Sequence, residues 1–389
     1  MRLLGTQAHG IRLPIISKGD ALEIISAECL KETIDKEGIT LSENDVIGIT
    51  EAVVAKAQGN YAGIKDIAQD IRDKFGDGEI GLVFPMLSRN RFLNILKGVA
   101  MGAKKVYVLL KYPSDEVGNP IMDTNMFDDI ERSISDPISA HDFLEITGNF
   151  LHPVTKLSYI SLFESVGENI EIYLSKDARD ILKFTNNVLV GEVHSREATK
   201  NKLVKAGAKK VFTLSDVLAR PVNNSGYNED YGVLGSNLST DDTLKLFPRD
   251  CKNFVQRLRD EINNKTGVSP EVLIFADGAF RDPAFGIWEL ADPVVCPAHT
   301  ERLGGMPDEI KLKFIADNIF GHLSGDSKQE AIVKMIREKK LQDKYFSEGT
   351  TPRRYADLLG SLCDLISGSG DKGTPMVLIR GYFDDYATE

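Results

Sequence analysis

The sequence has little that would support a disulfide framework or a metal–thiolate centre. Its 389 residues include only four cysteines, which stand far apart and form no Cys-x-x-Cys pair. This spacing is typical of reduced thiols in a protein core. The six histidines form no His-x-His, His-Glu-x-x-His or i,i+4 pair, so a zinc site is not expected.

Long apolar runs and blocks of positive charge are missing as well. No apolar stretch approaches the ~18 residues of a membrane-spanning helix, and no charged N-terminal region precedes an apolar one. We therefore expect a cytoplasmic protein that does not enter a membrane. Acidic residues outnumber basic ones by 58 to 47, for a formal charge of −11. Without a basic stripe, nucleic acid is not an expected partner.

What is present is the pattern of an ordinary globular protein, with 42% hydrophobic and 27% charged residues. The length suggests two or three domains. Apolar runs at 45–50, 80–84 and 106–110 have the length of buried strands, and a helical pattern at 92–101 separates the last two. A strand–helix–strand pattern recurs at 187–214. Such alternation is typical of a parallel sheet.

Changes in composition divide the chain into three parts. Residues 62–75 indicate an exposed amphipathic helix, and residues 221–231 are polar and rich in turn formers, as expected at a boundary. We predict an N-terminal part at 1–75, an α/β middle part at 76–225 and a C-terminal part at 226–389. The middle part can be an insertion into one domain that both chain ends build.

An aspartate follows the apolar run at 271–276. Asp277 opens the segment Asp-Gly-Ala-Phe-Arg, which ends at Arg281. A carboxylate at the end of a buried strand can hold a divalent metal together with phosphate oxygens. Arg281 can bind a carboxylate or a phosphate through two hydrogen bonds. An Asx turn with a surface ion pair explains the same residues equally well.

Three other segments have the chemistry of anion binding. The glycines of 367–375 let backbone N–H groups face an anion, and Lys372 can neutralise a phosphate, although a flexible connector explains this composition too. Lys56 can reach a phosphate or extend its stem over apolar surface. Arg89 and Arg91 stand at an expected helix N-terminus, where a ligand of the middle part would bind. Ordinary helix capping is the alternative there.

Four segments resemble, in the right order, motifs of the coenzyme F-420 gamma-glutamyl ligase family, GTP-dependent enzymes that add L-glutamate to a deazaflavin coenzyme. Residues 10–20 (GIRLPIISKGD) are similar to its G-x-P-L-I-K-x-G-D, and residues 49–59 (ITEAVVAKAQG) to its A-E-T-V-V-S-K-A-E-G. Residues 274–281 (IFADGAFR) resemble I-T-D-T-x-G-R, and residues 368–381 (GSGDKGTPMVLIRG) resemble G-E-x-x-G-I-P-V-V-V-V-R-G.

The resemblance covers roughly 8–70 and 226–385. It implies an α+β fold in which a gamma-glutamyl ligase core, formed by both chain ends, carries the middle part as an inserted α/β (parallel-sheet) domain. It also implies GTP as co-substrate, Mg²⁺ or Mn²⁺ as cofactor, and a homodimer like that of the short family members. The role of the middle part does not follow from it.

Residue by residue, the resemblance places Asp277 on a metal-binding aspartate, and we expect Lys56 and Arg281 to assist it in catalysis. The residues implied to bind the nucleotide are Leu13, Pro14, Ile15, Ile16, Glu51, Lys56, Asn237, Gly368, Ser369, Gly370, Asp371, Lys372 and Gly373.

Two positions depart from the family pattern. Leu234 stands where the family has an aspartate, and Ser369 where it has a glutamate. Since Mg²⁺ and Mn²⁺ prefer carboxylate oxygens, fewer acids should weaken metal binding. Acids that can substitute are Asp230, our expected second metal ligand, and Glu229, Asp241, Asp242 or Asp371.

The expected function is a GTP-dependent ligase. A cofactor carboxylate attacks the γ-phosphate to form an acyl phosphate, and the amine of L-glutamate then displaces phosphate from the acyl carbon. The acceptor is a deazaflavin coenzyme of the F-420 type or another carboxylate, such as a folate. The alternative is a catalytically weak relative that only binds a nucleotide or metabolite, because two acidic ligands are lost.

Overall fold

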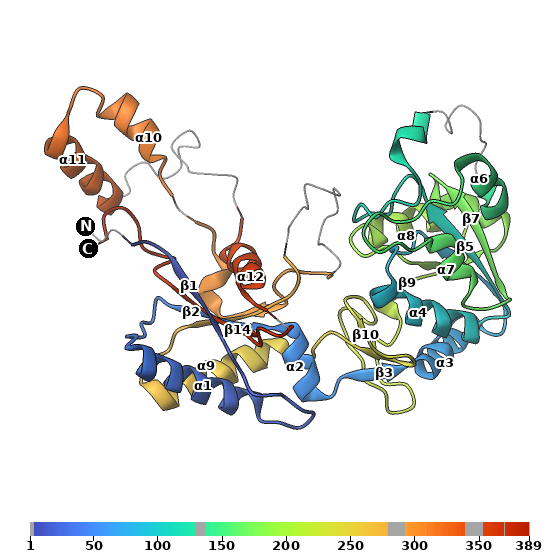
Figure 1. The fold of residues 1–389 in the computed structure, drawn as a ribbon, viewed down its shortest axis with the longest axis horizontal. Helices are drawn as coiled ribbons and strands as arrows, with labels where there is room; N and C mark the ends of the chain where they lie inside the picture. The colour runs from blue at the N-terminus through green and yellow to red at the C-terminus, as the bar shows by residue number, and fades with distance from the viewer. Residues whose placement is uncertain are drawn as a thin grey trace.

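A computed structural model describes residues 4–128, 137–278, 292–307, 309–338, 353–368 and 370–388. The chain contains both helices and mixed sheets, so the predicted α+β class is confirmed. Figure 1 shows a five-stranded sheet on one side of the molecule and a six-stranded sheet on the other, with a small three-stranded sheet between them.

Both chain ends build the five-stranded sheet. Its order is β1-β14-β2-β12-β13, and only β2 and β12 run parallel. The bounds of these strands are β1 Gln7–Ile11, β2 Val46–Thr50, β12 Glu271–Phe275, β13 Ala298–His299 and β14 Met376–Arg380. The first strand thus pairs with the last one, more than 360 residues away, at the register Gln7↔Arg380.

Helices cover both faces of this sheet, which explains its continuous apolar strands. Ile47, Ile274 and Leu378 belong to a core with α1 (Leu22–Glu37) and α9 (Cys251–Thr266). Their neighbours in the strands point to the other face and pack against α12 (Tyr355–Ile366). Figure 1 shows α1 and α9 on one side of the sheet and α12 on the other.

The middle part forms the six-stranded sheet, in the order β6-β7-β5-β4-β8-β9. All its pairs are parallel except that of the edge strand β6, so the predicted parallel sheet is confirmed. The bounds are β4 Glu79–Val83, β5 Lys105–Lys111, β6 Ile138–Ser139, β7 Ile170–Ser175, β8 Asn187–Val190 and β9 Lys210–Thr213. The domain boundaries proposed from the sequence stay predictions.

Helices lie on both faces of this sheet too. One core joins it to α3 (Ile64–Phe75), α4 (Arg89–Gly102), α6 (Ala140–Thr147) and α7 (Tyr159–Glu164). A second core joins the opposite face to α8 (Arg196–Lys205) and the 3-10 helix η2 (Ala178–Lys183). The short 3-10 helices η1 (Thr124–Met126), η3 (Leu214–Asp216) and η4 (Glu301–Gly304) lie in connections.

Helix α3 is not the exposed helix that the sequence predicted, because one of its faces packs closely on α4. Ile67, Ala68 and Ile71 are fully buried there. A Cβ atom on Gly98 would lie 2.6 Å from the Cβ of Ile67, and one on Gly102 would lie 2.6 Å from the carbonyl oxygen of Ala68. Glycine at both positions therefore allows the close approach.

The three-stranded sheet connects the two larger ones. Its order is β10-β11-β3, with bounds β3 Tyr61–Gly63, β10 Asn237–Thr240 and β11 Thr243–Lys245. Between β2 and β3 the chain forms α2 (Glu51–Gln58). The sheet is tied to α4 by Asn94, whose amide donates to the carbonyl oxygen of Thr240 at 3.1 Å.

A helical arm completes the fold. Helix α10 (Leu312–Phe314) continues into a π-helical turn at Ile315–Ile319, and α11 (Gly325–Glu338) folds back on it. Figure 1 shows the arm projecting from the five-stranded sheet. The helices of the described ranges include none with the length and hydrophobicity needed to cross a bilayer. All four cysteines are free thiols, as predicted.

Candidate active site

Acidic residues leave the five-stranded sheet at one edge. Strands β2 and β12 are parallel and in register, with Ile49 opposite Ile274 and Thr50 opposite Phe275. The residues that follow them, Glu51 and Asp277, therefore emerge at the same edge, where the carboxyl ends of parallel strands commonly form ligand sites. Glu51 begins α2 and is 4% exposed.

An arginine from the middle part reaches this edge. Arg91, in the first turn of α4, donates through Nη2 to Asp277 and through Nη1 to Asp292. Asp292 also accepts from the backbone N–H of Asp277 at 2.9 Å. Burial opposes the charge of Arg91, but Asp292 and Asp277 outweigh burial and raise the pKa of the guanidinium. One buried cation thus joins two carboxylates.

A second ion pair lies beside the first. The ammonium of Lys245, on β11, lies 2.7 Å from Oε1 of Glu51. Burial raises the pKa of Glu51 to about 7, with Asp292 adding to the rise and Lys245 opposing it. Atom Oε2 of Glu51 is buried and has no hydrogen-bond partner among the described residues. Asn237 is the register partner of Lys245 across the β10–β11 hairpin, which brings it to the same region.

The glycine-rich turn before β14 closes against the N-terminal segment. Gly368 and Thr374 form a bridge, and Gly373 takes a left-handed conformation with φ 62°. Its carbonyl oxygen accepts from the N–H of Leu13 at 3.3 Å. The residue after the turn, Pro375, accepts from the N–H of Thr50 at 3.0 Å. The turn therefore lies beside both the 12–13 segment and the beginning of α2.

The structure thus brings together much of the predicted nucleotide-binding set. Leu13, Glu51 and the described part of the 368–373 turn converge, and Ile16 is buried while Ile15 is 87% exposed. Lys56 is exposed on α2, but it lies about 140° around the helix from Glu51. The side chains of Lys56 and Glu51 therefore leave α2 on different faces, and the catalytic role of Lys56 stays a prediction.

Other predicted residues lie elsewhere or are not described. Asp230 is exposed at a cavity of about 450 Å³. Leu234, at the position of the family's acid, is buried in the apolar core of the middle part. Arg281 and Ser369 lie outside the described residues. Sequence reasoning missed Lys245 and Asp292, for which no local pattern exists, and it gave Arg91 no partner in the chain.

These residues do not fit a protein-held divalent ion as they stand. The carboxylates of Asp277 and Asp292 meet at the guanidinium of Arg91, so an ion could bind both only in place of that guanidinium. Within the described ranges, one group of at least three His, Cys, Asp or Glu side chains has its ligand atoms within 4.8 Å of one another: His141, Asp142 and Glu145.

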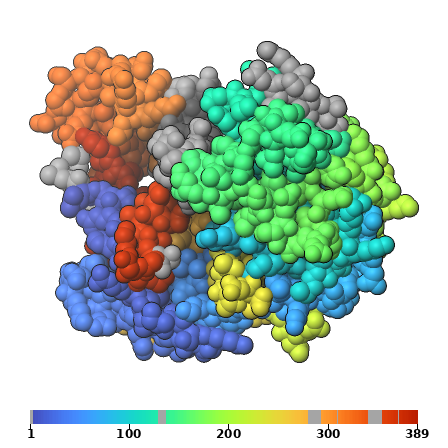
Figure 2. Space-filling model, turned by 45° about the vertical axis from the view of Figure 1, so that its right-hand side comes forward, coloured from blue at the N-terminus to red at the C-terminus, as the bar shows by residue number. Residues whose placement is uncertain are grey.

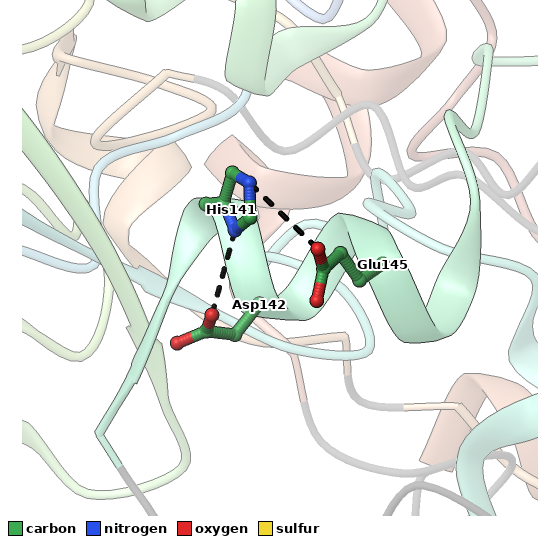
Figure 3. Close-up of side chains that lie close together, drawn as sticks. All are labelled: His141, Asp142 and Glu145. Carbon is green, nitrogen blue, oxygen red and sulfur yellow. Dashed lines mark hydrogen bonds and ion pairs between the residues drawn. The ribbon is translucent and has the colours of Figure 1, made fainter.

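That group lacks the burial of a metal site. Figure 3 shows its three side chains on a single turn of α6. Nδ1 of His141 lies 3.5 Å from Oδ1 of Asp142, and Nε2 of His141 lies 3.8 Å from Oε1 of Glu145. All three side chains are more than 60% exposed. Such a cluster is explained as a surface network of ion pairs.

A comparison with protein families gives a match that spans nearly the whole chain. A family model described as F420-0:Gamma-glutamyl ligase matches residues 10–381. The matched range contains the glycine-rich turn, Glu51, Arg91, Lys245, Asp277 and Asp292. No curated protein matches the chain.

Proposed function

Since the chain belongs to the F420-0:gamma-glutamyl ligase family, as its motifs predicted, we propose that it is a GTP-dependent enzyme acting on a carboxylate-bearing cofactor. The family supports a ligase that makes gamma-glutamyl bonds. The finer proposal is that L-glutamate is added to a deazaflavin coenzyme of the F-420 type. The main support for a nucleotide site is the convergence of the 12–13 segment, Glu51 and the glycine-rich turn at the sheet edge that also carries Asp277.

The nucleotide is proposed to bind over this edge. Backbone N–H groups at 370–372, between the internal hydrogen bonds of the turn, are suited to phosphate oxygens. The unpaired Oε2 of Glu51 provides a buried acceptor for a hydrogen bond from the nucleotide. Mg²⁺ or Mn²⁺, held by the nucleotide phosphates and not by Asp277 and Asp292, would supply positive charge against the phosphates.

The reaction then has two steps. An oxygen of the acceptor carboxylate attacks the γ-phosphorus, and the nucleoside diphosphate leaves with the electron pair of the broken P–O bond. The amine of L-glutamate attacks the acyl carbon, loses a proton and forms the amide, while inorganic phosphate leaves. Arg91, Lys245 and the turn surround the place where negative charge builds up, and such fixed charges favour phosphoryl transfer.

Phosphate release tests this proposal. The purified chain with GTP, Mn²⁺ and L-glutamate should release phosphate only when the right acceptor is added, and a deazaflavin and a folate should be compared. We expect Asp277→Asn to reduce the rate by at least about tenfold. Asp260→Asn, at an exposed carboxylate of α9, serves as the matched control and should keep the rate. No release with any carboxylate acceptor and with either GTP or ATP would remove the proposal.

A second function, binding without catalysis, is favoured by the burial of Leu234 and by the ion pair of Asp277 with Arg91. The chain would then bind a nucleotide or metabolite with little turnover. Calorimetric titration separates the two functions. Nucleotide affinity that does not change with Mg²⁺ or Mn²⁺, without phosphate release, would favour the binding protein. The homodimer and the cytoplasmic location stay predictions.

A further inference from the structure

We infer that Arg91 is a built-in counter-ion that takes the place of a protein-bound divalent cation between Asp277 and Asp292. The middle part of the chain would then complete the candidate site, which gives that part a role. The inference takes from the proposed function only the position of Asp277 at the site.

The geometry holds the guanidinium in one place. Its two terminal nitrogens bond to different carboxylates, and the Arg91 and Asp292 side chains are 15% and 2% exposed. Ser88 caps α4 by accepting from the N–H of Arg91 at 3.2 Å. Further along α4, Lys97 donates to the carbonyl oxygen of Asp241 at 3.2 Å. The first turn of α4 is therefore capped, and the helix is held against the turn between β10 and β11.

The balance of charge makes the guanidinium and a protein-held ion alternatives. Among the described residues, the guanidinium of Arg91 lies between the carboxylates of Asp277 and Asp292, and Lys245 pairs with Glu51 beside them. A divalent ion between Asp277 and Asp292 would lie within a few ångströms of Arg91, and like charges repel strongly where solvent is excluded. Leu234 is 1% exposed in an apolar core and supplies no oxygen that would favour the ion.

Binding of Mn²⁺ to the full chain, without nucleotide, tests the inference. Electron paramagnetic resonance or calorimetry should show no Mn²⁺ site in the wild type that depends on Asp277. Arg91→Met removes the guanidinium from between the two carboxylates and should create a Mn²⁺ site at least about tenfold tighter than any in the wild type. Arg91→Met combined with Asp277→Asn should lose it again.

Two control variants separate charge from structure. Arg89→Met removes an exposed arginine from the same helix turn and should create no site. Arg91→Lys keeps a positive charge and should also create none. Circular dichroism establishes that each variant is folded.

Two results would overturn the inference. One is Mn²⁺ binding to the wild type that Asp277→Asn abolishes, which can be measured even where Arg91→Met does not fold. The other is a folded Arg91→Met variant that gains no site. Neither measurement involves nucleotide or turnover, so failure of the proposed ligase activity would be recognised separately by absent phosphate release.

Discussion

Each buried carboxylate at the candidate site is stabilised by a cation from a distant part of the chain. Lys245, 194 positions from Glu51, pairs with it, and Arg91 pairs with Asp292 across 201 positions. Removing one partner of a buried ion pair leaves an uncompensated charge, at a cost of about 3–5 kcal/mol. The site residues therefore also contribute to the stability of the fold.

The raised pKa of Glu51 predicts a dependence of stability on pH. Its folded pKa is about 7, above the ordinary value of 4.5, so its contribution to stability is complete below pH ~4.5 and is lost as the pH rises through ~7. Urea unfolding at pH 5, 6, 7 and 8 should show that the free energy of unfolding of the wild type falls relative to Glu51→Gln, by on the order of 2–3 kcal/mol.

Asp115 provides a comparison for this experiment. Burial raises the pKa of Asp115 to about 6. The free energy of unfolding of the wild type relative to Asp115→Asn should therefore fall as the pH rises to about 6, at lower pH than for Glu51. Parallel profiles for the wild type and Glu51→Gln between pH 5 and 8 would contradict the Glu51 prediction.

At the scale of single residues, the sequence indicates positions but not partners. Asp277 could be found because a carboxylate directly follows an apolar strand, and Arg91 because it follows a helix-capping serine. Asp292 and Lys245 carry no comparable signal, since their neighbours form no motif. The pairing of Arg91 with Asp277 depends on how two sheets are placed, which no local pattern contains.

At the scale of secondary structure, burial on both faces decides what can be predicted. Strands β2, β4, β5 and β14 have helices on both faces, so their sequences are apolar runs that stand out. Strand β7 has alternating polar residues, and β3, β10 and β11 are short, so the pattern did not indicate them.

The contact of α3 with α4 gives a prediction at this scale. Gly98→Ala would place a Cβ atom 2.6 Å from the Cβ of Ile67. Alanine favours a helix over glycine by about 1 kcal/mol, but the overlap should outweigh this gain and destabilise the protein by about 1–3 kcal/mol. Urea unfolding measures the change. Met101→Ala, at an exposed position of the same helix, should change stability by less than about 0.5 kcal/mol. Equal or greater stability of Gly98→Ala would contradict the prediction.

At the scale of the whole molecule, long-range pairing builds the site. In Figure 2 the blue and red atoms of the two chain ends lie together, and the green and cyan atoms of the middle part form the neighbouring mass. Local patterns predicted most strands of both large sheets. Changes in composition left open that both chain ends build one domain, and the family resemblance implied it. Neither the local patterns nor the resemblance indicated that Arg91 of α4 would contact Asp277 and Asp292.

If the site includes residues of both large sheets, nucleotide binding should slow hydrogen exchange in both. Hydrogen–deuterium exchange of the full chain with GTP and Mn²⁺ should slow in peptides that cover 10–16, 49–58 and 370–376, because bound phosphates restrict the backbone of the turn and its neighbours. It should also slow at 86–93, the beginning of α4, because Arg91 reaches the site from there. Peptides from α8, on the far face of the six-stranded sheet, are the internal control and should exchange unchanged. If exchange slows only in peptides of the five-stranded sheet and its connections, and not at 86–93, in both the wild type and Arg91→Met, the middle part does not take part in binding.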